Sequence, residues 1–372
     1  MFSIKSLIKV IAYFILIGAF IIIAFINISP ELGGNPSKNQ RKTYETFKNY
    51  KNGEFHNLEL YQTMTGEMSM TEFFRNDSNR RPIVDIIPEK MDIKDFSKIQ
   101  FDKIKISWLG HSAFILNING NIILLDPMLG DYAAPIPIPS LERYNSESPL
   151  NVDEIKEISA VIFSHDHYDH LNYPTIKKIK NKVKKYFVPH GMGSHLMNWG
   201  IESEKIIELN WEESVVFNDI EFVCLPALHF SGRGIFNKNS TLWASWALKS
   251  DKGKIYFSGD SGYGNHFKNI GNVHGPFDLA LIDCGQYNVA WKYSHMFPEQ
   301  AIQAAKDLKS EYFMPIHWGA FTLSTHSWTE PVISALDYAE SSNQKIVTPR
   351  IGQVFYIPNE LNIDGDFWWR KF

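Results

Sequence analysis

The hexapeptide HDHYDH, residues 165–170, is the stretch that decides the fold of this chain. It follows Ala160–Phe163, a short apolar run that predicts a buried strand. On an extended segment the first two histidines project the same way, so one cation can bind both, and the final Asp-His pair can bind a second. Polar groups crowded at the end of an apolar strand would carry desolvation and repulsion costs without a cation. The hexapeptide therefore predicts two adjacent metal ions, and such a pair activates water.

Three further candidate ligands share one placement, just past the C-terminal end of a predicted strand. They are His229 after Glu221–Leu225, Asp260 after Lys254–Phe257, and His317 after Tyr312–Ile316. Taken alone, such an aspartate is most often a turn former and such a histidine a packed or solvated residue. Because strands of one sheet bring their ends together, we expect these three side chains to converge on the hexapeptide.

Two tetrahedral sites need about three protein ligands each, with water completing the shell. His165, His167 and His229 would fill the first site. Asp169, His170 and His317 would fill the second, and Asp260 could bridge both ions through its two oxygens. Ligation rich in histidine and free of cysteine favours two zinc ions, with manganese or iron left open.

The composition supports a large folded domain and gives no sign of nucleic-acid binding. The chain has 372 residues, of which 44% are hydrophobic, enough for one large domain or two. Its net charge of -4 lacks the basic excess typical of nucleic-acid binding. The two cysteines, Cys224 and Cys284, cannot build a disulfide framework, and we expect them in the core.

Residues 1–30 differ from the rest of the chain. Val10–Pro30 carries no charge, and Val10–Ile26 is almost wholly apolar. The run could be a cleaved signal peptide or an uncleaved membrane anchor. Because it is long for the core of a signal peptide, we predict one N-terminal transmembrane helix and a membrane-anchored protein. Lysines flank the run on both sides and leave its orientation open, with an extracytoplasmic catalytic domain preferred. Residues 31–100 are predicted to form a polar connector and N-terminal extension, and residues 101–372 the catalytic domain.

From Lys103 onward, short apolar runs alternate with turn signals. The predicted strands are Ile104–Leu109, Ala113–Leu116, Ile122–Leu125, Phe222–Leu225, Ile255–Phe257, Leu279–Ile282 and Tyr312–Ile316, and Pro298–Leu308 is a predicted helix. Many short strands with a few helices predict an α+β fold or a layered sandwich.

The order and spacing of the candidate ligands resemble the metallo-β-lactamase superfamily, whose signature is HxHxDH with downstream His, Asp and His. This resemblance implies a four-layer αββα sandwich with a binuclear site at one edge of its two sheets. The surrounding motifs are similar to the N-acylphosphatidylethanolamine-hydrolysing phospholipase D family. They are WLGHS at 108–112, LLDP at 124–127, SHDHYDHL at 164–171, LPALHFSGRG at 225–234, GDSGY at 259–263 and IHWGAF at 316–321.

The resemblance implies a zinc-dependent phosphodiesterase that cleaves a membrane phospholipid into an N-acylethanolamine and phosphatidic acid. It carries over the seven metal ligands and places His295 near the substrate phosphate, so Asp260, His295 and Asp166 are the predicted catalytic residues. Asp166 could relay a proton or orient a ligand histidine, and Arg233 could pair with phosphate or cap its own loop. Tyr168, Gln286 and Tyr287 are expected to contact substrate, while His111 and Asp126 are expected to support ligands. The sequence GQYN at 285–288 departs from the family's usual Gly-Ala-Tyr-Glu and leaves lipid selectivity open.

Two other functions stay open at this point. One is a hydrolase of the same fold, such as a lactonase, that acts on a soluble metabolite. The other belongs to a different class, a metal-stabilised membrane scaffold without turnover. The complete ligand set argues against the scaffold, and the sequence gives no oligomeric state.

Overall fold

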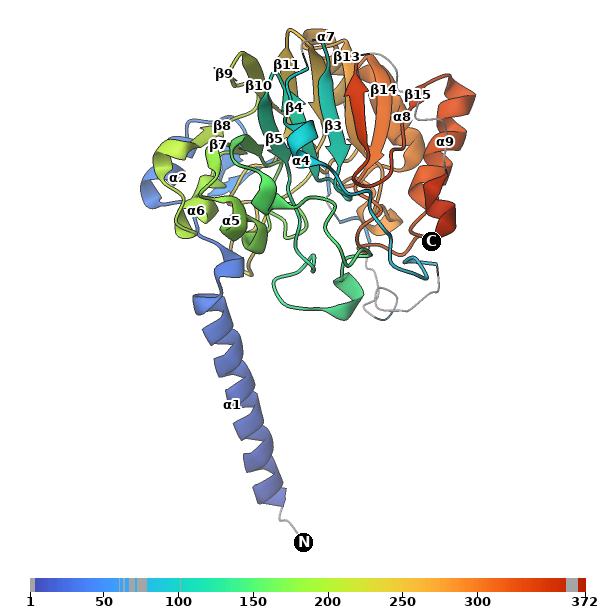
Figure 1. Cartoon of the computed structure of the whole chain (residues 1–372). Helices are drawn as coiled ribbons and strands as arrows, with labels where there is room; N and C mark the ends of the chain where they lie inside the picture. The colour runs from blue at the N-terminus through green and yellow to red at the C-terminus, as the bar shows by residue number, and fades with distance from the viewer. Residues whose placement is uncertain are drawn as a thin grey trace.

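The computed structural model describes residues 4–59, 61, 62, 64–66, 71, 79–100, 102–358 and 367–372. Within these residues the body consists of two seven-stranded sheets and a small two-stranded one (Figure 1). The first large sheet has the strand order β16-β3-β4-β5-β6-β7-β8, and the second has the order β15-β14-β13-β12-β11-β10-β9.

The strands of the first sheet are short and mostly buried. They are β3 (Ile104–Trp108), β4 (Phe114–Ile118), β5 (Asn121–Leu125), β6 (Ile158–Ile162), β7 (Val183–Pro189), β8 (Ile206–Leu209) and β16 (Val354–Ile357). The second sheet contains β9 (Ser214–Phe217), β10 (Ile220–Leu225), β11 (Ser245–Ser250), β12 (Gly253–Phe257), β13 (Phe277–Asp283), β14 (Ser310–Ile316) and β15 (Lys345–Ile346). Strands predicted from apolar runs in the sequence therefore belong to both sheets.

The two sheets pack face to face through one apolar core, to which Phe114 of β4 and Phe257 of β12 both belong. The outer face of the first sheet is covered by α5 (Tyr173–Ile179) and α6 (Gly193–Asn198), which share a second core with it. The outer face of the second sheet is covered by α7 (His266–Val273), α8 (Pro298–Asp307) and α9 (Glu330–Ser342). Helices therefore lie outside both sheets, and the predicted layered arrangement of helices and sheets is confirmed.

Strand direction gathers several chain segments at one edge of this structure. β12, β13 and β14 run parallel, and β10 runs the same way because two antiparallel pairings separate it from β12. In the first sheet, β5, β6 and β7 are also parallel. The carboxyl ends of these strands carry the hexapeptide and the three downstream candidate ligands.

The chain before the first sheet packs onto the body. α2 (Lys38–Tyr44), β1 (Tyr50–Lys51) and β2 (Glu54–Phe55) bring three aromatic side chains, Tyr44, Tyr50 and Phe55, into the core between the sheets. The short helix α4 (Ile93–Phe96) packs on the outer core of the first sheet. The division of the chain at residues 30 and 100 stays a prediction.

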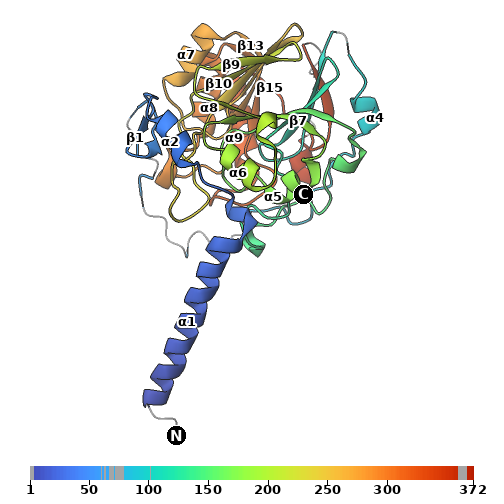
Figure 2. The ribbon, with the colours of Figure 1, turned by 90° about the vertical axis from the view of Figure 1, so that its left-hand side faces the viewer.

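The N-terminal helix α1 (Ile4–Ile28) projects from the body in both views (Figures 1 and 2). Among the residues that the structure describes, no helix has both the length and the apolar character needed to cross a bilayer. The prediction of a single-pass transmembrane anchor is therefore wrong, and the extracytoplasmic placement that depended on it is withdrawn. The run from Val10 to Ile26 falls short of the about 20 apolar residues that a spanning helix needs.

Candidate metal centre

The seven residues predicted to bind metal lie together at the carboxyl ends of the strands. Within the described part of the chain, they contribute to four overlapping groups, in each of which one ligand atom per residue lies within 4.8 Å of the others. Two groups have three members, namely Asp126, His165 and His170, and Asp260, His295 and His317. The other two groups have four members each. The first group is His165, His167, His229 and Asp260, and the second is His111, Asp169, His170 and His317. The two four-membered groups bring together the members of each predicted ligand set, and the second also contains His111, which was expected to support a ligand. The ligand roles themselves stay predictions.

In the first group, three imidazole nitrogens converge. Nε2 of His165 lies 2.8 Å from Nδ1 of His167, and Nε2 of His229 lies 3.3 Å from the same Nδ1 atom. Asp260 faces this group with Oδ2, which is 3.6 Å from Nε2 of His165 and 3.8 Å from Nε2 of His229. Such a cluster of nitrogen acceptors around one point has the donor chemistry of a zinc site.

Asp260 also contacts two histidines of the second group. Its Oδ2 lies 3.1 Å from Nε2 of His170, and its Oδ1 lies 3.0 Å from Nδ1 of His317. Asp169 closes the group, with Oδ2 at 3.3 Å from Nε2 of His170. The two oxygens of Asp260 thus reach both groups, as a bridging carboxylate would.

The residues present fit divalent cations. Nε2 of His170 and Oδ1 of Asp260 are buried and make no hydrogen bond, and buried polar atoms normally have a partner. Burial lowers the pKa of His165 and His229 well below the usual value and lowers that of His167 to about 4. These imidazoles are therefore neutral near pH 7, as metal ligation requires.

In contrast to those three histidines, His170 and Asp260 have raised pKa values. Burial opposes a charge on His170, but Asp260 and Asp169 raise its pKa well above the usual value. Burial raises the pKa of Asp260 to about 7, against the lowering effect of His170. A bound cation would take the place of the proton that these groups share.

Further side chains fix the orientation of the candidate ligands. Nδ1 of His170 lies 2.7 Å from Oδ2 of Asp126, and Nε2 of His111 lies 2.8 Å from Oδ2 of Asp169. Nδ1 of His229 donates to the carbonyl of Ser294 at 3.0 Å. Carboxylates and carbonyls that hold the second nitrogen of a ligand histidine are typical of metal centres.

The backbone is strained where the second group is built. His111 and His317 have φ values of 56° and 68°, in the left-handed region that side chains other than glycine seldom adopt. Their backbones are joined, because the N–H of His317 donates to the carbonyl of His111 at 3.1 Å. Strain of this kind is concentrated at functional sites, where the surrounding structure holds it.

His295 lies against the second group and forms a pair with Asp283. Its ring stacks on that of His317 with centroids 5.0 Å apart, and its Nδ1 lies 3.0 Å from Oδ2 of Asp283. Asp283 is fully buried and also accepts the backbone N–H groups of Ser261 and Gly285. The sequence reasoning missed Asp283, although it ends β13 in the same placement that singled out Asp260 and His317.

Asp166 and Arg233 are both buried and both bind neighbouring chain segments. The carboxylate of Asp166 accepts the N–H of Gly232 at 2.7 Å and the hydroxyl of Thr241 at 2.8 Å, and it lies 3.2 Å from Nε2 of His195. Arg233 donates to backbone carbonyls through Nε and both terminal nitrogens, and Tyr168 donates its hydroxyl to the carbonyl of Arg233. Of the two roles considered for Arg233, pairing with phosphate or capping its loop, these contacts correspond to capping the loop.

The two predicted substrate contacts on the loop after β13 also have partners within the protein. The side-chain amide of Gln286 donates to the carbonyl of Phe321 at 2.9 Å and accepts the N–H of Leu323 at 2.8 Å. The hydroxyl of Tyr287 donates to Glu330 at 2.9 Å. The substrate-binding roles of Gln286, Tyr287 and Tyr168 stay predictions.

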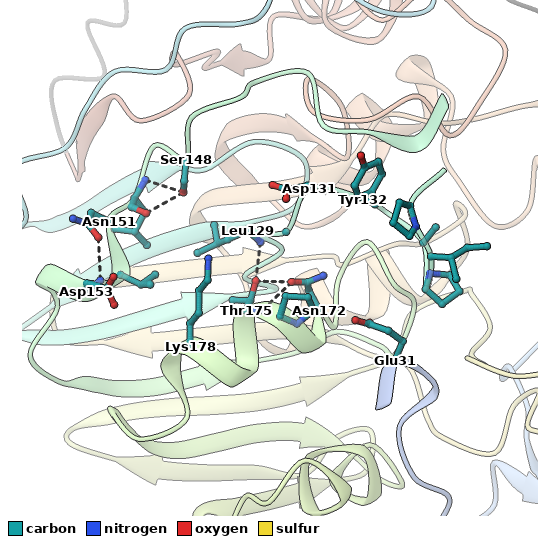
Figure 3. A pocket seen from close by; sticks show the side chains of 18 residues that line it. Glu31, Leu129, Asp131, Tyr132, Ser148, Asn151, Asp153, Asn172, Thr175 and Lys178 are labelled. Atoms are coloured by element: carbon teal, nitrogen blue, oxygen red, sulfur yellow. Dashed lines mark hydrogen bonds between the residues drawn. The ribbon is translucent and has the colours of Figure 1, made fainter. Parts of the chain in front are cut away.

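A cavity of about 500 Å³ lies between α5 and the connection from β5 to β6 (Figure 3). Leu129, Asn172 and Thr175 line it, and Glu31 from the N-terminal segment reaches its rim. Its lining contains none of the seven predicted metal ligands, so the polar cluster and not this cavity is the candidate site of chemistry.

Residues 121–318 match the model of the beta-lactamase superfamily domain. An uncharacterized protein of Mycobacterium tuberculosis is 35% identical over 351 residues, covering 92% of each chain. The N-acyl-phosphatidylethanolamine-hydrolyzing phospholipase D 1 of Caenorhabditis elegans is 35% identical over 231 residues, which are 59% of this chain and 65% of that one. An enzyme of Saccharomyces cerevisiae with the same activity in its name is 32% identical over 235 residues, or 60% of this chain and 49% of that one.

Solved structures share the fold at low sequence identity. A metallo hydrolase of Ignicoccus hospitalis is 21% identical with a TM-score of 0.53, covering 69% of this chain and 100% of that one. The diiron beta-hydroxylase CmlA of Streptomyces venezuelae is 15% identical with a TM-score of 0.53, covering 69% of this chain and 54% of that one.

Fold, site and sequence together define the class: the chain belongs to the beta-lactamase superfamily. Within it, the chain has homologues named as N-acyl-phosphatidylethanolamine-hydrolyzing phospholipases D, as the sequence motifs indicated. The protein is a metal-dependent hydrolase, which argues against the alternative of a scaffold without turnover.

Proposed function

We propose that this protein is a phosphodiesterase that hydrolyses N-acylphosphatidylethanolamine-like lipids to N-acylethanolamine and phosphatidic acid. The observation that carries the proposal is the convergence of His165, His167, His229, Asp169, His170, His317 and Asp260 around two adjacent points. The enzyme names of the relatives from Caenorhabditis elegans and Saccharomyces cerevisiae support the lipid substrate.

Two divalent cations held by these residues would lower the pKa of a water molecule and stabilise negative charge on the phosphoryl oxygens. The chain's own contribution is to bring imidazoles and carboxylates together, with Asp260 and Asp169 at 3.1 Å and 3.3 Å from Nε2 of His170. His295 lies beside the second group with Nδ1 directed at Asp283, which leaves Nε2 for the substrate. A phosphodiester bound there would have a hydrogen-bond donor next to its leaving oxygen when His295 is protonated.

We propose zinc as the native metal. All candidate nitrogen donors are imidazoles, and both cysteines are buried and belong to none of the candidate groups among the described residues. Zinc suits this donor set, although iron and manganese accept it as well. The diiron enzyme among the fold relatives shows that this fold also holds iron, so elemental analysis of the purified protein is the measurement that decides.

The substrate is tested with vesicles that contain an N-acylated phosphatidylethanolamine, with phosphatidylcholine vesicles and a soluble lactone as comparisons. We expect metal-loaded protein to release N-acylethanolamine and phosphatidic acid from the first substrate only. Turnover of the lactone without release of either lipid product would instead favour the soluble-metabolite hydrolase.

Exchange of Asp283 for Asn should lower kcat by about 100-fold, the lower end of the range that a positioned acid or base contributes. The amide carries no negative charge, so it cannot stabilise the protonated form of His295 as the carboxylate does, and less of the proposed proton donor is present. Metal content should stay at the wild-type value, because Asp283 belongs to neither metal group. Unchanged kcat with normal metal content would rule out a role for this pair in turnover.

A further inference from the structure

The short segment that follows α1 is hydrogen-bonded to two residues, Arg233 and His195, that also bind the hexapeptide loop. It runs through the turn η1 (Pro30–Leu32) to Gly34, and we call residues 30–34 the strap. Figures 1 and 2 show this part of the chain beside α5 and α6, before it continues into α2. The strap is therefore more than 130 residues away from the hexapeptide in sequence but close to it in the fold.

Arg233 joins the strap to the loop that carries the metal ligands. Its Nε and Nη2 donate to the carbonyl of Glu31 at 3.0 Å and 2.7 Å. Its Nη1 donates to the carbonyls of Asp166 and Leu171 at 2.6 Å and 2.7 Å. These two carbonyls flank the ligands His167, Asp169 and His170, so one buried guanidinium holds both sides of the ligand-bearing turn.

His195 makes a second connection between the same two segments. The N–H of Gly34 donates to Nδ1 of His195 at 3.1 Å, so the ring proton lies on Nε2 and is directed at Oδ2 of Asp166, 3.2 Å away. Trp199 adds a bond from its Nε1 to the carbonyl of Pro30 at 2.7 Å. The contacts thus form a closed ring, from the strap through Arg233 to the metal loop and back through Asp166 and His195.

The last two residues of the strap, Gly33 and Gly34, leave no room for a side chain. A Cβ atom on Gly34 would lie 2.4 Å from the carbonyl oxygen of Ser194, and a Cβ atom on Gly33 would lie 2.2 Å from Nδ1 of His195. Gly33 also has a φ of 68°. Backbone groups of the strap, rather than its side chains, make the bonds to Arg233 and His195, so the fit depends on close backbone approach.

We propose that the strap is a positioning element for the metal centre, acting through Arg233 and His195 on the hexapeptide loop. Neither residue is one of the proposed ligands; each holds the backbone or the carboxylate of Asp166, which lies between ligands His165 and His167 in the chain. Loss of supporting contacts around metal ligands typically costs about 10- to 100-fold in metal affinity. The inference rests on the proposed metal centre but not on the identity of the lipid.

The test is zinc affinity, measured on the full-length protein by competition with a chromogenic chelator. Gly34→Ala should weaken zinc binding by about 10- to 100-fold, although no residue near the metal is altered. Gly18→Ala is the matched control, because a Cβ atom there meets no atom within 4 Å, and its zinc affinity should equal that of wild type. Hydrogen exchange over residues 163–171 should speed up in Gly34→Ala and stay unchanged in Gly18→Ala.

A second variant keeps the inference testable should Gly34→Ala fail to fold. Arg233→Lys preserves the charge but cannot make the four hydrogen bonds that Arg233 donates to three carbonyls, so it should weaken zinc binding to a similar extent. In the double variant that combines Gly34→Ala with Arg233→Lys, the loss of zinc-binding free energy should be much smaller than the sum of the two single losses. Both substitutions act through one set of contacts. Wild-type zinc affinity in both single variants, or fully additive losses, would overturn the positioning role. A wild-type protein that binds no zinc would instead overturn the metal centre itself.

Discussion

Replacing Asp260 with Asn should reduce phosphodiester hydrolysis by about three orders of magnitude, the upper end of the loss for one group that stabilises transition-state charge. Asp260 lies 3.1 Å from Nε2 of His170 through one oxygen and 3.0 Å from Nδ1 of His317 through the other. An amide has one oxygen and no negative charge, so it cannot serve both groups. The measurement is kcat on N-acylated phosphatidylethanolamine vesicles, together with the metal content per chain.

The control for this variant is Asp251→Asn, which changes an exposed carboxylate that pairs with Lys252 in a turn. Its activity and metal content should match those of wild type. We expect Asp260→Asn to remain folded, since the amide is nearly the same size as the carboxylate it replaces. Full activity in a folded Asp260→Asn protein would disprove the bridging role and the division of the cluster into two sites.

The sheets were largely predictable because their strands are short, apolar and nearly fully buried. The predicted runs Ile122–Leu125 and Tyr312–Ile316 lie within β5 and β14. Strands without such a run were not found from the sequence. β9 alternates exposed and half-buried positions, and β7 carries two lysines near its start, so neither shows the apolar signal on which the sequence reasoning relied.

The candidate ligands could be predicted because they share one placement at the ends of strands, and parallel strands bring those ends together. Their supporting residues follow no such rule. His195 lies on a helix and Glu31 precedes the first sheet, and only the folded chain brings His195 to Asp166 and Glu31 to Arg233. Asp283 did share the placement, but a single carboxylate at a strand end is too common a feature to stand out.

The apolar N-terminal segment misled the sequence reasoning because a long uncharged run was read as a membrane span. The C-terminal sequence Phe-Trp-Trp at 367–369 is also hydrophobic, but it packs on the protein. Trp368 and Trp369 are buried, and Trp368 stacks on Trp318, one residue after the candidate ligand His317. Hydrophobic character alone therefore does not say whether a segment meets lipid or protein, and packing partners must be known first.

Removing the metal should abolish hydrolysis and lower the thermal stability of the protein. Without cations, the buried Nε2 of His170 and Oδ1 of Asp260 have no hydrogen-bond partner. A ligand present at about 1,000 times its Kd stabilises the native state by roughly 4 kcal/mol, which corresponds to a rise in Tm on the order of 5–10 °C for a protein of this size. Dialysis against a chelator, followed by calorimetry and assay with and without added zinc, measures both effects.

The stability of the metal-free protein should depend on pH because of its buried histidines. Burial holds the pKa of His165, His229 and His317 well below the usual value, so the metal-free native state keeps these rings neutral while the unfolded chain protonates them below about pH 6.5. The raised pKa values of His170 and Asp260 act in the opposite direction. The histidines with a lowered pKa, which include His167, outnumber these two groups. The unfolded state then binds more protons overall, and the stability of the metal-free protein should fall as the pH drops from 7 to 5.

The two readouts of the metal-removal experiment, Tm and activity, separate a catalytic metal from a structural one. Added zinc should restore both Tm and activity at pH 7. Restoration of Tm without turnover would mean that the metal only stabilises the fold, and the proposed hydrolytic role of the cluster would be refuted.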